Sequence, residues 1–210
     1  MQSSRAVLTC LAVLSAGLTA CGAAGSSSSA AVSVAASPAP SSAASLPAMS
    51  SSPSVSAVVF NGQDVTFSTD MIDHHRQAVA MALLAPKRTT TRAVLALAKA
   101  IDTAQAPEIA MMSSWLTGWG KPIPEDMGGM DMGGSMPGML SMAQLDKLAA
   151  AKGAAFDKQF LTLMIAHHQG AVTMARTQIA KGSDARVVAM AKKVVTDQSA
   201  EIATMRAMLR

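Results

Sequence analysis

The 210-residue sequence has few aromatic side chains, few charges and almost no cysteine. Tyrosine is absent and aromatic residues make up 3% of the chain, so few side chains are available on which nucleic-acid bases could stack. The formal net charge of +4 comes from scattered Lys and Arg residues, without the basic stripe that a phosphate backbone requires. We therefore expect no nucleic-acid partner.

The two cysteines, Cys10 and Cys21, lie in a segment with the features of an export signal. Arg5 precedes an apolar run over residues 6–20 that is too short for a comfortable membrane span. The run ends in Leu18-Thr19-Ala20-Cys21, which resembles the bacterial lipobox, in which the cysteine is lipidated and becomes the mature N-terminus. We expect residues 1–21 to be a lipoprotein signal peptide, although an ordinary signal cut near residue 20 would also imply export.

A lipidated Cys21 would anchor the protein on the extracytoplasmic face of the cell membrane and leave the mature chain without a disulfide or a thiolate ligand. Residues 22–60 consist mainly of Ser, Ala and Pro, with hardly a charge. Such a composition cannot bury enough apolar surface to offset its ordering entropy, and it predicts a disordered tether. Residues 61–210 are then left as one folded domain.

The folded part contains an internal repeat with an offset of 93 positions. Met71-Ile72-x-His74-His75 returns as Met164-Ile165-x-His167-His168, and all four histidines of the protein lie in these two copies. The offset persists to Gln105-x-x-Glu108 and Gln198-x-x-Glu201. A period this long exceeds one solenoid unit, so we predict two repeated helical hairpins over residues 64–119 and 157–210.

The apolar residues of each repeat favour helices by type and by spacing. Ala, Leu and the 17 Met residues have high helix propensity. In the first helix of each repeat they recur with the 4-3-4-3 spacing of one helical face. The two stripes are Phe67, Met71, His74, Ala78 and Met81, and Phe160, Met164, His167, Ala171 and Met174.

Capping and helix-breaking residues predict where the helices begin and end. We expect N-caps at Asp64 and Asp157, first-helix ends at Pro86 and Lys181-Gly182, and second helices that begin near Arg92 and Asp184. Pro107 should kink its helix. Ser141 and Gln144 have the spacing of a capping box for a short extra helix that stops at Gly153.

Antiparallel packing of each hairpin should bring polar residues of the inward stripes together. It places His74 at the height of Glu108, and His167 at the height of Glu201. Leaving such groups buried without a partner would cost about 2–7 kcal/mol each, and more for a charge. His75 and His168 lie about 100° further around their helices, from where they can flank the same site.

Two interpretations satisfy these residues. In one, buried His–Glu or His–Gln hydrogen bonds fix the helix register. In the other, which the duplication of all the groups favours, they bind a metal, and thioethers among the ligands favour Cu(I). The candidate ligands are His74, His75, His167, His168, Glu108, Glu201, Met71, Met81, Met164 and Met174. Whether the two His pairs share one site depends on whether the linker between the repeats crosses the bundle.

That linker, residues 121–140, is rich in Gly, Pro and Met. Methionine on an exposed, flexible segment has no core to fill, so we consider five of these residues as accessory copper or silver ligands. They are Met127, Met130, Met132, Met136 and Met139. The alternative is a plain connector whose methionines pack against the bundle.

These motifs resemble the bacterial "domain of unknown function 305" family, whose pattern is Phe, then Met-Ile-x-His-His-x-x-Ala-x-x-Met-Ala, then Gln-x-x-Glu-Ile. Residues 67–112 and 160–205 carry it, together with Trp115-Leu116-x-x-Trp119-Gly120. The resemblance implies a ferritin-like four-helix bundle, usually exported, with copper-binding members. Two departures are Pro107 and Arg76, which stands where glutamine is common and would place a positive charge beside one His pair.

We therefore expect an exported, lipid-anchored copper- or silver-binding protein that acts as a buffer or carrier and not as an enzyme. One alternative is a metal-free interaction or stress module in which the histidines are structural. Another is a di-iron oxidase, but such sites use four inward glutamates and Glu-x-x-His motifs, and only Glu108 and Glu201 qualify here. The oligomeric state is left open.

Overall fold

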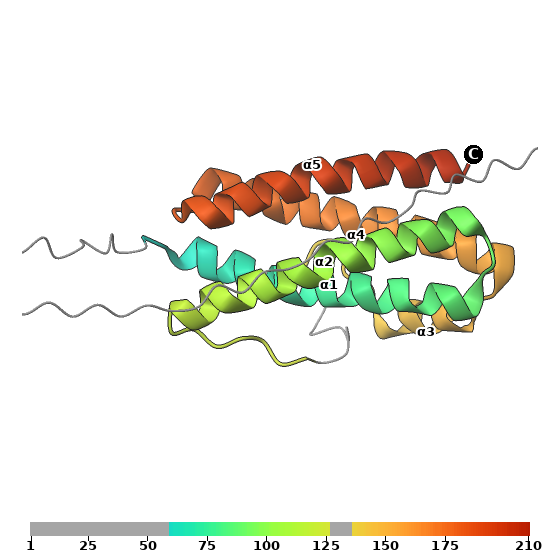
Figure 1. Ribbon diagram of the computed structural model, residues 1–210, viewed down its shortest axis with the longest axis horizontal. Coiled ribbons are helices and arrows are strands. Elements are labelled where there is room, and N and C mark those ends of the chain that lie inside the picture. Colours follow the sequence, from blue (N-terminus) through green and yellow to red (C-terminus); the bar gives the residue numbers. More distant parts are fainter. Residues whose placement is uncertain (1–58, 127–135) are drawn as a thin grey trace, which may run out of the picture. The chain divides into compact units, whose positions relative to one another are not determined.

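The computed structural model describes residues 59–126 and 136–210, and within these ranges the chain is all-α. The first hairpin consists of α1 (Gly62–Arg88) and α2 (Arg92–Gly118), and the second of α4 (Gly153–Lys181) and α5 (Ala185–Met208) (Figure 1). The short α3 (Met142–Ala150) lies between them in sequence. The predicted fold of two repeated helical hairpins is confirmed. The signal segment, Cys21 and residues 22–58 lie outside the described residues.

The two hairpins join through α1 and α4. Each hairpin packs along its length, α1 packs against α4, and α3 packs against both of these helices. Figure 1 shows the four long helices running along a common direction. In the described ranges, no helix combines the length and the apolar character that a membrane span needs.

The apolar core is divided into two clusters by a layer of polar residues at mid-height. On all four long helices, the buried apolar residues on one side of this layer belong to one cluster, and those on the other side to the second. Phe156, Phe160 and Ile101 lie in the first cluster, and Phe67 and Trp115 in the second. We refer to eight residues as the polar layer: His74, His75, Gln105, Glu108, His167, His168, Gln198 and Glu201.

Several predicted helix boundaries need correction. Asn61, not Asp64, is the N-cap of α1, and Asp64 is the N3 residue of its capping box. Asp157 lies inside α4, and Pro86 lies inside the last turn of α1, which continues to Arg88. Gly153 does not stop α3 but begins α4, with a φ of 54°. Pro107 lies within α2, which stays one helix, and the predicted starts at Arg92 and Asp184 and the Ser141–Gln144 capping box are confirmed.

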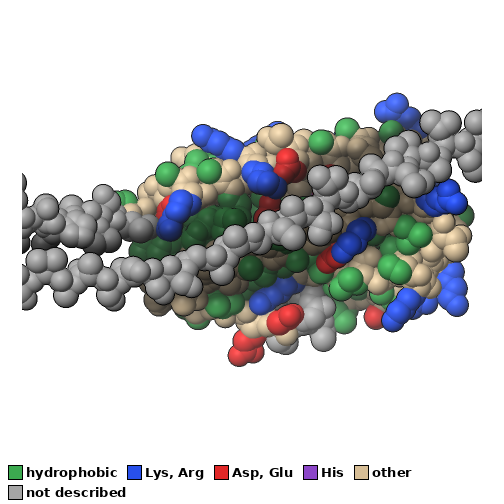
Figure 2. All heavy atoms as spheres, viewed as in Figure 1, with side chains coloured by type: hydrophobic (Ala, Val, Ile, Leu, Met, Phe, Trp, Pro, Cys, Tyr) green, Lys and Arg blue, Asp and Glu red, His purple; other side chains and the backbone are tan. Residues whose placement is uncertain are grey.

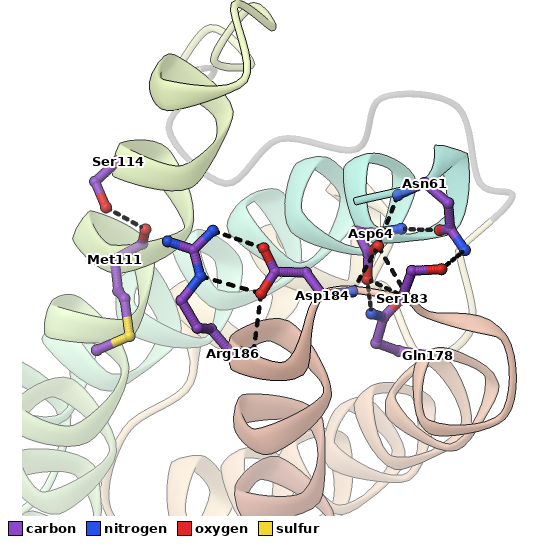
Figure 3. Close-up of polar contacts among 8 residues, drawn as sticks. All are labelled: Asn61, Asp64, Met111, Ser114, Gln178, Ser183, Asp184 and Arg186. Atoms are coloured by element: carbon purple, nitrogen blue, oxygen red, sulfur yellow. Dashed lines mark hydrogen bonds and ion pairs between the residues drawn. The ribbon is translucent and has the colours of Figure 1, made fainter. Parts of the chain in front are cut away.

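Asp64 has a larger role than capping, because it ties the start of α1 to the loop between α4 and α5 (Figure 3). Its buried carboxylate accepts backbone N–H groups of Asn61, Ser183 and Asp184 and the side-chain amide of Gln178. The equivalent residue in the second repeat, Asp157, accepts the hydroxyl of Thr91 at 2.6 Å, in the α1–α2 loop. The first helix of each repeat therefore holds the loop of the other repeat.

Candidate metal centre

All four histidines lie in the polar layer, where α1 packs against α4, and their exposed fractions are at most 1%. The rings of His74 and His167 face each other, with centroids 3.8 Å apart and planes 39° apart. Figure 2 shows one face of the molecule, and no histidine side chain is visible on the part of it that is coloured by residue type. The fold therefore brings the two His pairs together at one place, which the sequence left open.

The glutamates bond to the second histidine of each pair, not the first. His75 Nε2 lies 2.8 Å from Glu108 Oε2, and His168 Nε2 lies 2.7 Å from Glu201 Oε2. The expected pairing of Glu108 with His74 is therefore wrong. Because α1 packs against both α2 and α4, one residue of rotation decides which neighbour a side chain meets: His75 meets α2, and His74 meets α4.

His74 instead bonds to the end of the linker. Its Nε2 lies 3.1 Å from the carbonyl oxygen of Pro137. The linker segment 136–140, here called the strap, crosses α1 and α4 at this height. Gln77 binds it by donating to the Leu140 carbonyl at 3.1 Å and accepting the Leu140 N–H at 2.7 Å.

On α4 the strap lies directly against a glycine. A Cβ on Gly170 would lie 1.8 Å from the Pro137 oxygen, so no other residue fits without moving the strap. Gly170 and Gln77 occupy equivalent positions of the two repeats. This difference between the repeats was the available signal that a single segment crosses both helices, and sequence reasoning missed it.

Met136 and Met139 of the strap are half-buried, whereas Met127, Met130 and Met132 lie outside the described residues.

The hydrogen bonds fix which ring nitrogen carries the proton. A carbonyl or a carboxylate oxygen can only accept, so Nε2 of His74, His75 and His168 is protonated, and in a neutral imidazole Nδ1 then has the lone pair. Within the described residues, each of these Nδ1 atoms is buried without a hydrogen-bond partner, and neither ring nitrogen of His167 has one. An unsatisfied buried polar atom costs about 1–3 kcal/mol, so five such nitrogens in one layer need an explanation.

Burial keeps the central imidazoles neutral. Burial, reinforced by neighbouring His75, lowers the pKa of His74 from 6.5 to about 3. Burial and the adjacent His74 lower the pKa of His167 well below its ordinary value. Burial alone would raise the pKa of Glu108, but the hydrogen bonds and charges of His75 and Lys193 outweigh it and lower this pKa. The result is a central pair of neutral imidazoles beside a histidine that a carboxylate holds, and metal-binding histidines commonly have such a carboxylate partner.

The predicted thioether ligands lie on both sides of the histidines. Met71 and Met164 are fully buried, one turn before the first histidine of each pair. Met71 and Met174 pack in one apolar cluster, and Met81 and Met164 in the other. In the described part of the chain, no three His, Cys, Asp or Glu side chains form a ready metal cluster. The layer as described therefore lacks the carboxylate-rich arrangement of a di-iron site, and offers imidazole and thioether donors instead.

Arg76 does not face the histidines. Its guanidinium donates to Asp73 at 3.0 Å and to the carbonyls of Pro124 and Glu125 at 2.9 and 3.1 Å. It therefore holds the start of the linker, and its charge is paired with Asp73. The expectation that Arg76 places its positive charge beside one His pair has no support in this geometry.

Residues 64–209 match the family described as domain of unknown function (DUF305). The chain belongs to the DUF305 family. Two solved DUF305 structures share its fold. One, from Streptomyces coelicolor, is 32% identical, with a TM-score of 0.64 over 70% of this chain and 91% of the other. The second, a fragment from Deinococcus radiodurans, is 33% identical, with a TM-score of 0.65 over 71% of this chain and 97% of the other.

This DUF305 chain is also similar to CopM. The structure described as CopM in the Cu(II)-bound form is 33% identical, with a TM-score of 0.61 over 70% of this chain and 95% of CopM. CopM has also been solved in Cu(I)-bound and silver-bound forms. None of the curated protein sequences matches the chain significantly. Metal-binding proteins are thus among the structural relatives of this DUF305 chain.

Proposed function

We propose that this protein binds Cu(I), or the chemically similar Ag(I), in the polar layer and acts as a metal buffer or carrier outside the cytoplasm, not as an enzyme. The observation that carries the proposal is the set of five buried ring nitrogens without hydrogen-bond partners among the described residues. A soft cation would use their lone pairs. The similarity to CopM, which has been solved with copper and with silver, supports the same chemistry.

The histidines of the polar layer and the methionines beside them would have distinct roles in holding the ion. The Nδ1 atoms of His74, His75 and His168, and one ring nitrogen of His167, are the nitrogen donors. Met71 and Met164 add thioethers, which select soft Cu(I) over harder cations. Met81 and Met174 lie further along the helices, as a second pair of sulfurs.

Glu108 and Glu201 would orient the imidazoles rather than bind the ion, because their bonded oxygens already accept from His75 and His168. The strap closes the layer over His74 through Pro137. Met136 and Met139 on the strap, with Met127, Met130 and Met132 before it, would be accessory donors that pass the ion to the layer.

Export and anchoring complete the proposal. The Streptomyces coelicolor relative is described as a predicted secreted protein, which supports export of this chain. Lipidation of Cys21 would then hold the domain at the extracytoplasmic face of the membrane. In an oxidising compartment a site built from imidazole and thioether, without thiolates, has no cysteine to lose to oxidation.

Titration of the purified full-length chain with Cu(I) and Ag(I), against a competing chelator, tests the proposal. We expect the double variant His74→Asn/His167→Asn to bind Ag(I) at least ~100-fold more weakly. Met71→Leu/Met164→Leu should weaken it less, while Met111→Leu, which changes a methionine that is 47% exposed on α2, should leave it unchanged. Binding that persists after all four histidines are replaced would refute the proposal.

The hydrogen bonds His75–Glu108 and His168–Glu201 also favour the second candidate, a metal-free interaction or stress module with structural His–Glu pairs. The two candidates differ in their response to ligand. A protein that binds the ion only when folded is stabilised by it, so Cu(I) should raise the melting temperature of the metal-free chain. A melting temperature that Cu(I) does not change would support the structural module instead.

A further inference from the structure

The side of the polar layer away from the strap opens into a seam between α2 and α5. The two Gln-x-x-Glu motifs meet there: Gln105 and Glu108 line it from α2, and Gln198 and Glu201 from α5. The seam has room for about one water molecule or one ion. It adjoins a groove of about 510 Å³ between the same helices, visible in Figure 2 as a recess lined by hydrophobic side chains.

Two buried glutamines point to a ligand in this seam. Gln105 and Gln198 are 3% and 4% exposed, and the Oε1 atom of each is buried without a hydrogen-bond partner in the described part of the chain. Both side chains line the seam. Because an amide oxygen can only accept, a donor or a cation is needed to satisfy it. Two equivalent amide oxygens without hydrogen-bond donors therefore line one small space, and both could act as ligands to a cation there.

The charges around the seam are unbalanced in favour of a cation. Three carboxylates line it, those of Glu108, Asp197 and Glu201, against the single ammonium of Lys193. Lys193 Nζ lies 2.6 Å from Asp197 Oδ2 and 3.0 Å from Glu108 Oε1. These hydrogen bonds, first to Asp197 and then to Glu108, raise the pKa of Lys193 to about 12, so it is a permanent positive charge. Two negative charges remain, which a divalent cation would neutralise.

The repeat shows where that cation would lie. The positions equivalent to Lys193 and Asp197 in the first repeat are Ala100 and Ala104. Glu108 therefore has an ammonium partner from the opposite hairpin, whereas Glu201 has none among residues 59–126 and 136–210. The neighbouring Lys99 does not supply one, because it pairs with Asp102 on the exposed surface.

We propose that the seam between α2 and α5 is a second cation site, for an oxygen-preferring divalent cation, at the position that the repeat relates to the Lys193 ammonium. Its protein ligands are the Oε1 atoms of Gln105 and Gln198 and the free carboxylate oxygen of Glu201. Amide and carboxylate oxygens suit Mn²⁺, Mg²⁺ or Ca²⁺, whereas the imidazoles and thioethers of the polar layer suit a soft monovalent ion. The proposal does not depend on copper binding.

Mn²⁺ is the probe, because the loss of its free-ion electron paramagnetic resonance signal reports binding directly. We expect the full-length chain to bind Mn²⁺, and Gln105→Leu/Gln198→Leu to weaken binding at least tenfold while Ag(I) binding is retained. Lys193→Met removes the competing ammonium and frees a Glu108 oxygen, so it should tighten Mn²⁺ binding about tenfold. Lys99→Met removes the same charge from the exposed face of α2 and should change nothing.

Tighter binding by Lys193→Met cannot result from misfolding, so this variant keeps the test decisive even where the glutamine variant is unstable. His74→Asn/His167→Asn should weaken Ag(I) binding at least ~100-fold and leave Mn²⁺ binding intact, which separates the seam from the copper site of the polar layer. Mn²⁺ affinity that is the same in the wild type, the glutamine variant and Lys193→Met would overturn the proposal. So would the absence of Mn²⁺ binding in all three.

Discussion

The contact between Gly170 and the strap is the most severe steric constraint in the site, and Gly170→Ala tests it. The added Cβ would lie 1.8 Å from the Pro137 oxygen and 2.4 Å from its carbonyl carbon. Both atoms belong to the backbone, so no side-chain rotation relieves the overlap. The strap must move away from α4, and the Pro137 carbonyl is then withdrawn from Nε2 of His74.

The structure sets the size of the effect. Loss of the partner of a buried imidazole N–H costs about 1–3 kcal/mol, and overpacking against a well-seated segment costs a further 1–3 kcal/mol or so. Alanine in place of glycine within a helix returns about 1 kcal/mol. The net expectation is roughly 3 kcal/mol of lost stability, which for a domain of this size lowers the melting temperature by of order 10 °C.

Thermal unfolding of the full-length chain, followed by far-ultraviolet circular dichroism, measures this change. Gly62→Ala is the matched control, because a Cβ at this helical glycine meets no atom within 4 Å. We expect the control to melt at or slightly above the wild-type temperature. If Gly170→Ala does the same, the strap is not seated on α4 as described, and the account of His74 fails with it.

The histidines, the loop contacts of Asp64 and the glutamates each allow one more test. In the metal-free protein, the lowered pKa values of His74 and His167 mean that the unfolded chain binds more protons below pH 6.5, in the case of His74 down to a pH of about 3. Stability should therefore fall as the pH drops through this window, by about 1.4 kcal/mol per pH unit for each histidine, and urea unfolding of His74→Asn/His167→Asn should show a flatter profile. Asp64→Ala leaves several backbone donors unsatisfied and should lower the urea midpoint by the equivalent of about 3 kcal/mol, more than Asp157→Ala, which loses one hydroxyl donor. Glu108→Gln should weaken Ag(I) binding about 10- to 100-fold, because it loosens the orientation of the imidazole that the carboxylate holds; unchanged affinity would remove the glutamate from the site.

The two hairpins could be predicted from the sequence because their signals are local and duplicated. Apolar residues recur with a period of 3.6 residues in both copies, so the sequence predicts helices and predicts the same order of helices in each copy. The N-caps at Asp64 and Asp157 were wrong for a reason that the sequence hides. The partners of Asp64 at Ser183 and Asp184 lie about 120 residues away, and a carboxylate at N3 of a helix looks the same in sequence as one at the N-cap.

The grouping of the histidines and glutamates in one layer could be predicted from the sequence, but their pairing could not. Spacing correctly placed His74 and Glu108 in one layer, since height along antiparallel helices follows from residue counts. Which neighbouring helix a side chain faces depends on rotation, and this required the contact between α1 and α4. The strap residue Pro137 carries no motif of its own, so its carbonyl could be assigned to His74 only from the fold.

Two of the differences between the repeats lie where the polar layer meets its surroundings. The histidines and glutamates are duplicated without change, but Gln77 is replaced by Gly170 at the equivalent position on the strap side. Lys193 is replaced by Ala100 in the same way on the seam side. A purely structural role in fixing helix register would require the buried pairs to be kept and would place no demand on these boundary positions. The repeats therefore differ on the strap side and on the seam side of the polar layer. Such differences suit a binding site whose ligands are symmetric but which an ion reaches from only one side.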